Sequence, residues 1–237
     1  MSSPDRRRGG LSSSLRRGAG TAAALLLLAG MSSPQAQTVV PNAHLDTALT
    51  PWASFVSAAP DPAGSGNAPL WQAAPDVDGN PASGSSLIHI ATTVPAANAA
   101  SGIAQCFDFA GGPAPVSFVN YGMAFRLPAG TPADGAVAAT VEVRLFSAAG
   151  CNGFIAGGTQ GQSLSAPGVV AGSWNRLADS GFVPPGAPVT AASVQIRGYL
   201  RQTGAPASQA GYAVDLDHFL LVLNSTTPVE LLQFSVD

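Results

Sequence analysis

The stretch Tyr212-Ala-Val-Asp-Leu-Asp-His-Phe-Leu-Leu-Val-Leu223 decides the fold class of this chain. Its first half alternates apolar and polar residues, its second half is almost wholly apolar, and Asn224 and Ser225 end it. This pattern is typical of a long strand buried on at least one face. We therefore expect the other strands of the domain to be organised around residues 212–223.

Nine further short segments have the pattern of strands and none has that of a helix, which predicts an all-β domain. They are residues 37–40, 52–58, 69–73, 86–91, 102–109, 116–127, 137–147, 173–182 and 192–200. The clearest alternation is Val141-Glu-Val-Arg-Leu145, whose apolar residues should face the core of a sandwich. The simplest arrangement pairs the first strand with the last in antiparallel fashion. It would also give the turn-rich segment Pro41–Trp52 a partner.

Glycine and proline punctuate the chain, with 27 and 20 residues spread between the apolar runs. They supply the turns of a many-stranded domain. Residues 57–67 and 148–172 are so rich in Gly, Ser, Ala and Pro that we predict two long loops. In a sandwich, long loops gather at the ends and often carry binding sites.

The N-terminus has the features of a secretory signal peptide, with five arginines, an apolar run at 22–31 and a polar stretch ending near Ala36. The alternative, a membrane anchor, needs about 20 apolar residues, and this run is half that length. Twin-arginine export is a second route. We therefore expect a signal peptide at 1–36, a β-sandwich at 37–224 and a tail at 225–237 that adds an edge strand or docks on a neighbour. The mature protein should be secreted or periplasmic, without a membrane span.

Removal of residues 1–36 leaves five arginines, no lysine and twelve acidic residues, so the remaining chain has a net charge of −7. Nucleic acid is therefore a poor partner, because phosphate contacts require a basic face. The five arginines are scattered along the sequence, which argues against a single anion site.

Cys106 and Cys151 are the only cysteines. Export would place them in an oxidising compartment, so we expect a disulfide between them. The alternative, a two-cysteine metal site, lacks a nearby Cys-x-x-Cys or a pair of histidines.

Six short motifs follow a recurring plan: Pro-Asn-x-x-Leu-Asp-x-x-Leu-x-x-Trp at 41–52, Asp-x-Asp-Gly and Ser-Gly-Ser within 76–85, Gln-Cys at 105–106, Ser-Trp at 173–174 and Asp-x-Phe-x-Leu at 217–221. In this order they resemble the galactose-binding-like jelly rolls, in particular the carbohydrate-binding modules of secreted bacterial proteins. The resemblance covers about Val39 to Leu223. It departs from the family's pattern in the first motif, which reads Asn42-Ala-His-Leu-Asp46, and at His218, where Asn is usual.

The resemblance implies a structural calcium held between the first and last strands by Asp46 and Asp217, with backbone carbonyls completing an oxygen shell. The alternative is that both are exposed or turn-forming acids, and Asp215 is a further ligand or a solvent-facing residue. The run Asp76-Val-Asp-Gly-Asn80 is a second place for a metal, with an ordinary Asp/Asn/Gly turn as the alternative. The three histidines, at 44, 89 and 218, are too far apart in sequence to suggest a metal cluster.

A glycan-binding surface would present aromatic rings beside polar groups that fix sugar hydroxyls. Trp71 and Tyr199 are the candidate contacts, whereas Trp52 and Trp174 should be structural residues of the core. The chain has no Gly-x-Ser-x-Gly elbow and no pair of carboxylates that suggests a glycosidase, so we expect no enzyme. The sequence thus predicts a secreted, non-enzymatic binding module of carbohydrate-binding type whose partner is a glycan or cell-surface polysaccharide. The alternative is a structural or adhesive surface scaffold with no small-molecule ligand.

Overall fold

The computed structural model describes residues 40–57, 68–90, 99–165, 168–204 and 211–224, which all lie in the compact unit Pro34–Asp237. Every regular element among them is a β-strand. The strands are β1 (Ala53–Ser57), β2 (Leu70–Gln72), β3 (Ser85–Ile90), β4 (Ala100–Asp108), β5 (Ala114–Val116), β6 (Val119–Arg126), β7 (Val137–Ala148), β8 (Asn152–Ser165), β9 (Trp174–Phe182), β10 (Val189–Ala191), β11 (Ser193–Gln202) and β12 (Tyr212–Leu223). No helix in these ranges is long and apolar enough to cross a membrane.

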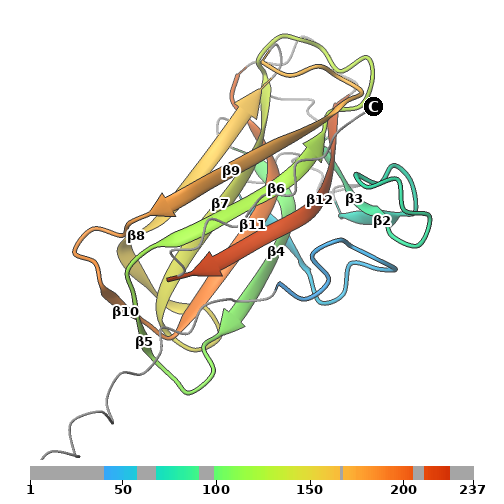
Figure 1. Cartoon of the computed structure of the whole chain (residues 1–237). Coiled ribbons are helices and arrows are strands. Elements are labelled where there is room, and N and C mark those ends of the chain that lie inside the picture. The colour runs from blue at the N-terminus through green and yellow to red at the C-terminus, as the bar shows by residue number, and fades with distance from the viewer. Residues whose placement is uncertain (1–39, 58–67, 91–98, 166–167, 205–210, 225–237) are drawn as a thin grey trace, which may run out of the picture. The chain divides into compact units, whose positions relative to one another are not determined.

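The strands form two five-stranded antiparallel sheets, in the orders β1-β4-β11-β7-β8 and β2-β3-β12-β6-β9 (Figure 1), with a short pair of β5 and β10. Five chain connections, from β1 to β2, β3 to β4, β6 to β7, β8 to β9 and β11 to β12, pass from one sheet to the other. Each sheet therefore collects strands that are distant in sequence, which is the arrangement of a jelly roll. The predicted jelly-roll sandwich is confirmed.

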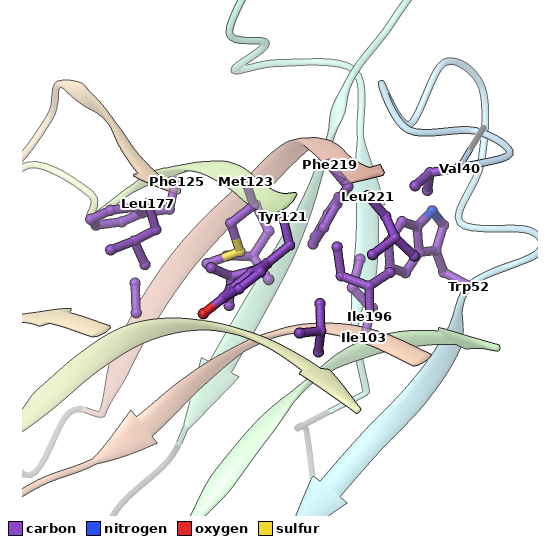
Figure 2. Close-up of a cluster of buried hydrophobic side chains, with 14 of the residues drawn as sticks. Val40, Trp52, Ile103, Tyr121, Met123, Phe125, Leu177, Ile196, Phe219 and Leu221 are labelled. Atoms are coloured by element: carbon purple, nitrogen blue, oxygen red, sulfur yellow. The ribbon is translucent and has the colours of Figure 1, made fainter. Parts of the chain in front are cut away.

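The strand β12 is central in its sheet and coincides with the predicted segment 212–223, pairing with β3 on one side and β6 on the other. Val214 and Leu216 are fully buried, as their alternation requires. Figure 2 shows the core between the sheets, where Ile103 and Ile196 of one sheet lie below Phe219 and Leu221 of the other. The alternation of β7 is also confirmed, since its three apolar residues at 141, 143 and 145 are fully buried.

The predicted pairing of the first strand with the last stays a prediction, because most of the predicted first strand, 37–40, lies outside the described residues. The first described strand, β1, pairs with β4. The segment 41–52 forms turns, and it reaches β12 through a hydrogen bond from the Phe219 N–H to the Ala43 carbonyl, at 2.9 Å. The predicted strand 116–127 corresponds to β6, and its first residue, Val116, ends the separate short strand β5.

The predicted loop 148–172 contains the 14-residue strand β8. This strand lies at the edge of its sheet and pairs only with β7, with an irregular register near Phe146. Gly153 and Gly157 have positive φ and produce the bends of this irregular pairing. An edge strand of this composition resembles a loop in sequence, because few of its side chains face the core. Of the other predicted loop, residues 58–67 lie outside the described part of the chain.

The predicted disulfide is present. Cys106 in β4 is bonded to Cys151 in the turn between β7 and β8, with the two Cα atoms 6.0 Å apart. The bridge therefore links the β7–β8 hairpin to β4, which lies on the other side of β11 in the same sheet.

Candidate functional site

A group of long polar and aromatic side chains shares the outer face of the sheet β1-β4-β11-β7-β8. Alternate residues of β7 and β11 point into the core, so the residues between them point outward. Together with β1 they form a surface that we call the Tyr199 face, which consists of Phe55, Glu142, Arg144, Gln195, Arg197, Tyr199 and Arg201.

The strand register explains why these side chains lie across the face. Tyr199 is opposite Gly102 on β4, and Arg197 is opposite Ala104 on β4 and Glu142 on β7. A Cβ atom at Gly102 would lie only 2.4 Å from the Cβ of Tyr199, so no larger residue fits there. Small neighbours on β4 thus leave room for the long side chains of β11.

The carboxylate of Glu142 contacts four other side chains at this surface. Its Oε2 accepts a hydrogen bond from the Tyr199 hydroxyl at 3.0 Å, and its Oε1 accepts one from the Thr159 hydroxyl at 3.0 Å. The Nη1 of Arg197 and the Nε of Arg144 lie 3.9 and 3.7 Å from its carboxylate oxygens. One carboxylate therefore orients two hydroxyls and two guanidinium groups.

Aromatic rings flank both arginines. The Arg197 guanidinium lies 4.4 Å from the centroid of the Phe55 ring, and the Phe55 and Tyr199 rings are 5.3 Å apart. On the other side, the Arg144 guanidinium lies 4.4 Å from the centroid of Phe154, which is 42% exposed. Stacking of this kind holds a guanidinium flat on the surface while its edge N–H groups stay available.

The expectation that the arginines are scattered is wrong in three dimensions. Three of the five arginines after residue 36, at positions 144, 197 and 201, share the Tyr199 face. The Nε of Arg201 is buried and has no hydrogen-bond partner among the described residues. Burial lowers the pKa of Arg197, and Glu142 acts against that change. Burial and Glu142 raise the pKa of Tyr199, so its hydroxyl keeps its proton.

The structure does not bring the two predicted ligand contacts together. Trp71 lies in β2, in the other sheet from Tyr199. Its ring is partly buried against the core, and its indole N–H donates to the Leu45 carbonyl at 2.7 Å. Trp71 therefore anchors the turn segment 41–52.

The two other tryptophans differ from each other. Trp52 is buried against Phe219, with the ring centroids 4.2 Å apart, as predicted for a core residue. The prediction for Trp174 is wrong, because it is partly exposed, with the Arg126 guanidinium 5.9 Å from its ring centroid.

Asp217, one of the two predicted calcium ligands, is fully buried. Its Oδ2 accepts from the Val77 N–H at 3.1 Å and its Oδ1 from the His218 N–H at 2.6 Å. Burial raises the pKa of Asp217 to about 8, with smaller contributions from Asp76 and Asp78.

Asp46, the other predicted ligand, is exposed, and its backbone N–H donates to Asn42 Oδ1. Within the described ranges no recorded contact joins the Asp46 and Asp217 carboxylates. Calcium takes six to eight oxygen ligands, whereas both oxygens of Asp217 already accept backbone N–H groups. The calcium pair stays a prediction.

Two neighbouring acids have structural roles. Asp215 is buried and not solvent-facing, and it accepts from Arg126 Nε at 2.9 Å and from Gln72 Nε2 at 2.6 Å. Asp76 Oδ1 accepts from the backbone N–H groups of Asp78 and Asn80 at 3.0 and 2.7 Å. Asp76 thus organises an Asp/Asn/Gly turn, the alternative to an oxygen-ligand calcium loop, while the carboxylate of Asp78 in the same turn faces His44 and His218.

The histidines overturn the expectation drawn from their spacing. The rings of His44 and His218 lie 4.2 Å apart between centroids, and both approach the carboxylate of Asp78. Burial and His44 lower the pKa of His218, with Asp78 opposing them. Sequence separation hid this cluster, because the turn segment 41–52 folds back onto β12.

No protein-family model matches the chain, and no curated protein matches its sequence. Similar solved structures include a family 61 carbohydrate-binding module in complex with β-1,4-galactotriose, at a TM-score of 0.45 and 12% identity, covering 77% of this chain and 95% of that one. Carbohydrate-binding modules of the β-sandwich superfamily, described for promiscuous specificity, match at 0.46 and 10% identity, over 72% and 56%. The K1 cleaved adhesin domain of Lys-gingipain from Porphyromonas gingivalis matches at 0.39 and 13% identity, over 77% and 95%. The first two belong to the class that the sequence motifs resemble.

Proposed function

We propose that this protein is a secreted, non-enzymatic binding module whose Tyr199 face binds a saccharide chain that carries anionic groups. The observation that supports this proposal is that Arg144 and Arg197 flank the single carboxylate of Glu142, on a face that also carries Arg201 and the rings of Phe55 and Tyr199.

The residue types suit a sugar ligand. Sugar rings have an apolar face that stacks on aromatic side chains, while their hydroxyls need donors and acceptors in fixed positions. Phe55 is partly exposed and Phe154 is exposed, so both supply aromatic surface, and Gln195 and Arg197 supply polar groups joined by a hydrogen bond of 2.6 Å. These groups are oriented before any ligand arrives, which lowers the entropy cost of binding.

The charge favours an anionic sugar, such as one carrying carboxylate or sulfate groups. Glu142 can compensate one of the three guanidinium groups, so the group of four side chains has a net charge of +2. Guanidinium groups bind carboxylate and sulfate oxygens through paired N–H donors. This local positive charge is opposite in sign to the net charge of −7 that the chain has after residue 36. It therefore favours an anionic ligand at this face in particular.

The test is a glycan array that pairs neutral glycans with carboxylated or sulfated counterparts, probed with the purified protein. We expect binding to the acidic members, weakened by salt because exposed charges are screened. Arg197→Gln and Tyr199→Ala should reduce the signal, whereas Arg176→Gln, on β9 of the other sheet, should not. A positive array whose signal survives both substitutions would keep a binding function and reject this surface. No signal from folded protein on a broad array would favour the structural or adhesive scaffold.

A further inference from the structure

We propose that His44, Asp78 and His218 bind a first-row transition-metal ion, with Zn²⁺ as the ion whose preferred ligands they match. The three side chains come from separate parts of the chain: the turn segment 41–52, the connection between β2 and β3, and β12.

The distances suit a shared ion. His44 Nδ1 lies 3.5 Å from Asp78 Oδ2, His218 Nδ1 lies 3.9 Å from Asp78 Oδ1, and a ligand atom from each residue lies within 4.8 Å of the other two. Ligand atoms on a tetrahedral zinc with bonds of 2.0–2.1 Å are about 3.3 Å apart. Side-chain rotations that close these gaps by an ångström or so would complete the geometry.

The backbone holds His218 in place by an unusual conformation. His218 has a φ of +52° and lies at the register shift between Asp217 and Leu220, where β12 bulges against β6. A bulge of this kind re-aims a side chain and costs backbone strain that a flat strand avoids. The next residue, Phe219, donates its N–H to Ala43, directly before His44. The bulge thus attaches the two histidine-bearing segments to each other.

The segment that carries His44 is also anchored. Leu45 is fully buried, and its carbonyl accepts the Trp71 indole N–H. The Asn42 side chain donates to the carbonyls of Ala48 and Thr50, at 2.7 and 2.9 Å. His44 is therefore presented by a turn that is fixed on both sides, although the residue itself is exposed.

The backbone N–H of Asp78 donates to the carboxylate of Asp76, while the carboxylate of Asp78 faces the two histidines. The carboxylate of Asp76 is occupied by the N–H groups of the turn and by the Ser83 hydroxyl, at 2.5 Å. Among the described residues, the contacts of the Asp78 carboxylate are those with His44 and His218.

The chemistry of the ligands selects the metal class. Imidazole nitrogens together with one carboxylate suit zinc and other first-row transition ions, whereas calcium and magnesium take oxygen ligands. Three protein ligands leave a fourth position for water. Because the ligands come from three segments that are distant in sequence, the bound ion would clamp the start of the domain to its last strand.

The experiment is calorimetric titration of Zn²⁺ into tag-free, chelator-treated protein, with Co²⁺ absorption as a spectroscopic check of nitrogen ligation. We expect one ion per chain and a melting temperature that rises with zinc. His44→Gln and His218→Asn should each weaken zinc binding at least tenfold. Asn is chosen at 218 because it tolerates positive φ, so the bulge is kept.

His89→Asn is the matched control, since His89 lies in β3 outside the cluster, and it should bind zinc as the unaltered protein does. Failure of folded protein to bind zinc would overturn the proposal. So would zinc binding that is unchanged in the His44→Gln/His218→Asn double variant, because the ion would then bind elsewhere. A glycan result of either sign leaves this test untouched, since the Tyr199 face lies on the other sheet.

Discussion

The hydroxyl of Tyr199 lies 3.0 Å from Oε2 of Glu142, across the pairing of β11 with β7. This contact joins the aromatic part of the Tyr199 face to the carboxylate that orients its arginines. A hydrogen bond to a charged acceptor is worth about 1.5–3 kcal/mol, and partial exposure reduces that value.

Tyr199→Phe should therefore lower the free energy of unfolding by about 1 kcal/mol, because Glu142 loses a donor while the ring stays in place. Urea unfolding of both proteins measures the difference. Glycan binding should also weaken, because Glu142 is then less firmly oriented. Unchanged stability and unchanged glycan binding together would show that the hydrogen bond from Tyr199 does not orient Glu142.

Asp217 should make stability depend on pH in metal-free protein. Burial raises the pKa of Asp217 from 3.8 to about 8, so the folded state binds its proton more tightly than the unfolded state does. The contribution of protonated Asp217 to the free energy of unfolding is fully present below about pH 4 and is lost as the pH rises toward 8. Urea unfolding in chelator at pH 5 and pH 8 checks the sign.

Asp217→Asn should flatten this dependence, and the exposed Asp46→Asn should leave it intact. A remaining slope is expected from Asp215, whose pKa is also raised by burial, against the opposing effect of Arg126. Stability that increases from pH 5 to pH 8 in the unaltered protein would contradict the prediction.

The calcium prediction is tested by melting. If Asp46 and Asp217 bind calcium, the folded state gains about 2.7 kcal/mol at a free concentration of 100 times Kd. The melting temperature should then rise with calcium, and Asp217→Asn should abolish the rise. A melt that responds to zinc but not to calcium would reject the calcium pair in favour of the histidine cluster.

Gly198 tests the packing between the sheets. An added Cβ atom would lie 2.6 Å from ring atoms of Phe219 and 2.9 Å from Met123 Sδ. We expect Gly198→Ala to destabilise the protein by about 1–3 kcal/mol through overpacking. Gly161→Ala is the control, because its Cβ would meet the nearest atom, the Val141 carbonyl oxygen, at 3.2 Å on the outer face of the same sheet. Equal effects of the two substitutions would contradict this account of the core.

The sequence alone determined the fold class, most strands and the disulfide. Periodicity located β12 at its observed bounds, because a strand buried between two neighbours must be apolar along its length. Cysteine count and the expectation of export predicted the pair Cys106–Cys151. Periodicity missed β8, because an edge strand with few core-facing side chains carries little of that signal.

Only the tertiary structure decided the candidate sites. Arg144 and Arg197 are 53 positions apart in sequence, and they share a surface because β7 and β11 are neighbours in a jelly roll. His44 and His218 meet because a turn at the start of the domain folds onto a bulge near its end. Such contacts depend on strand order and register across nearly the whole chain, whereas sequence patterns report each residue's relation to its near neighbours.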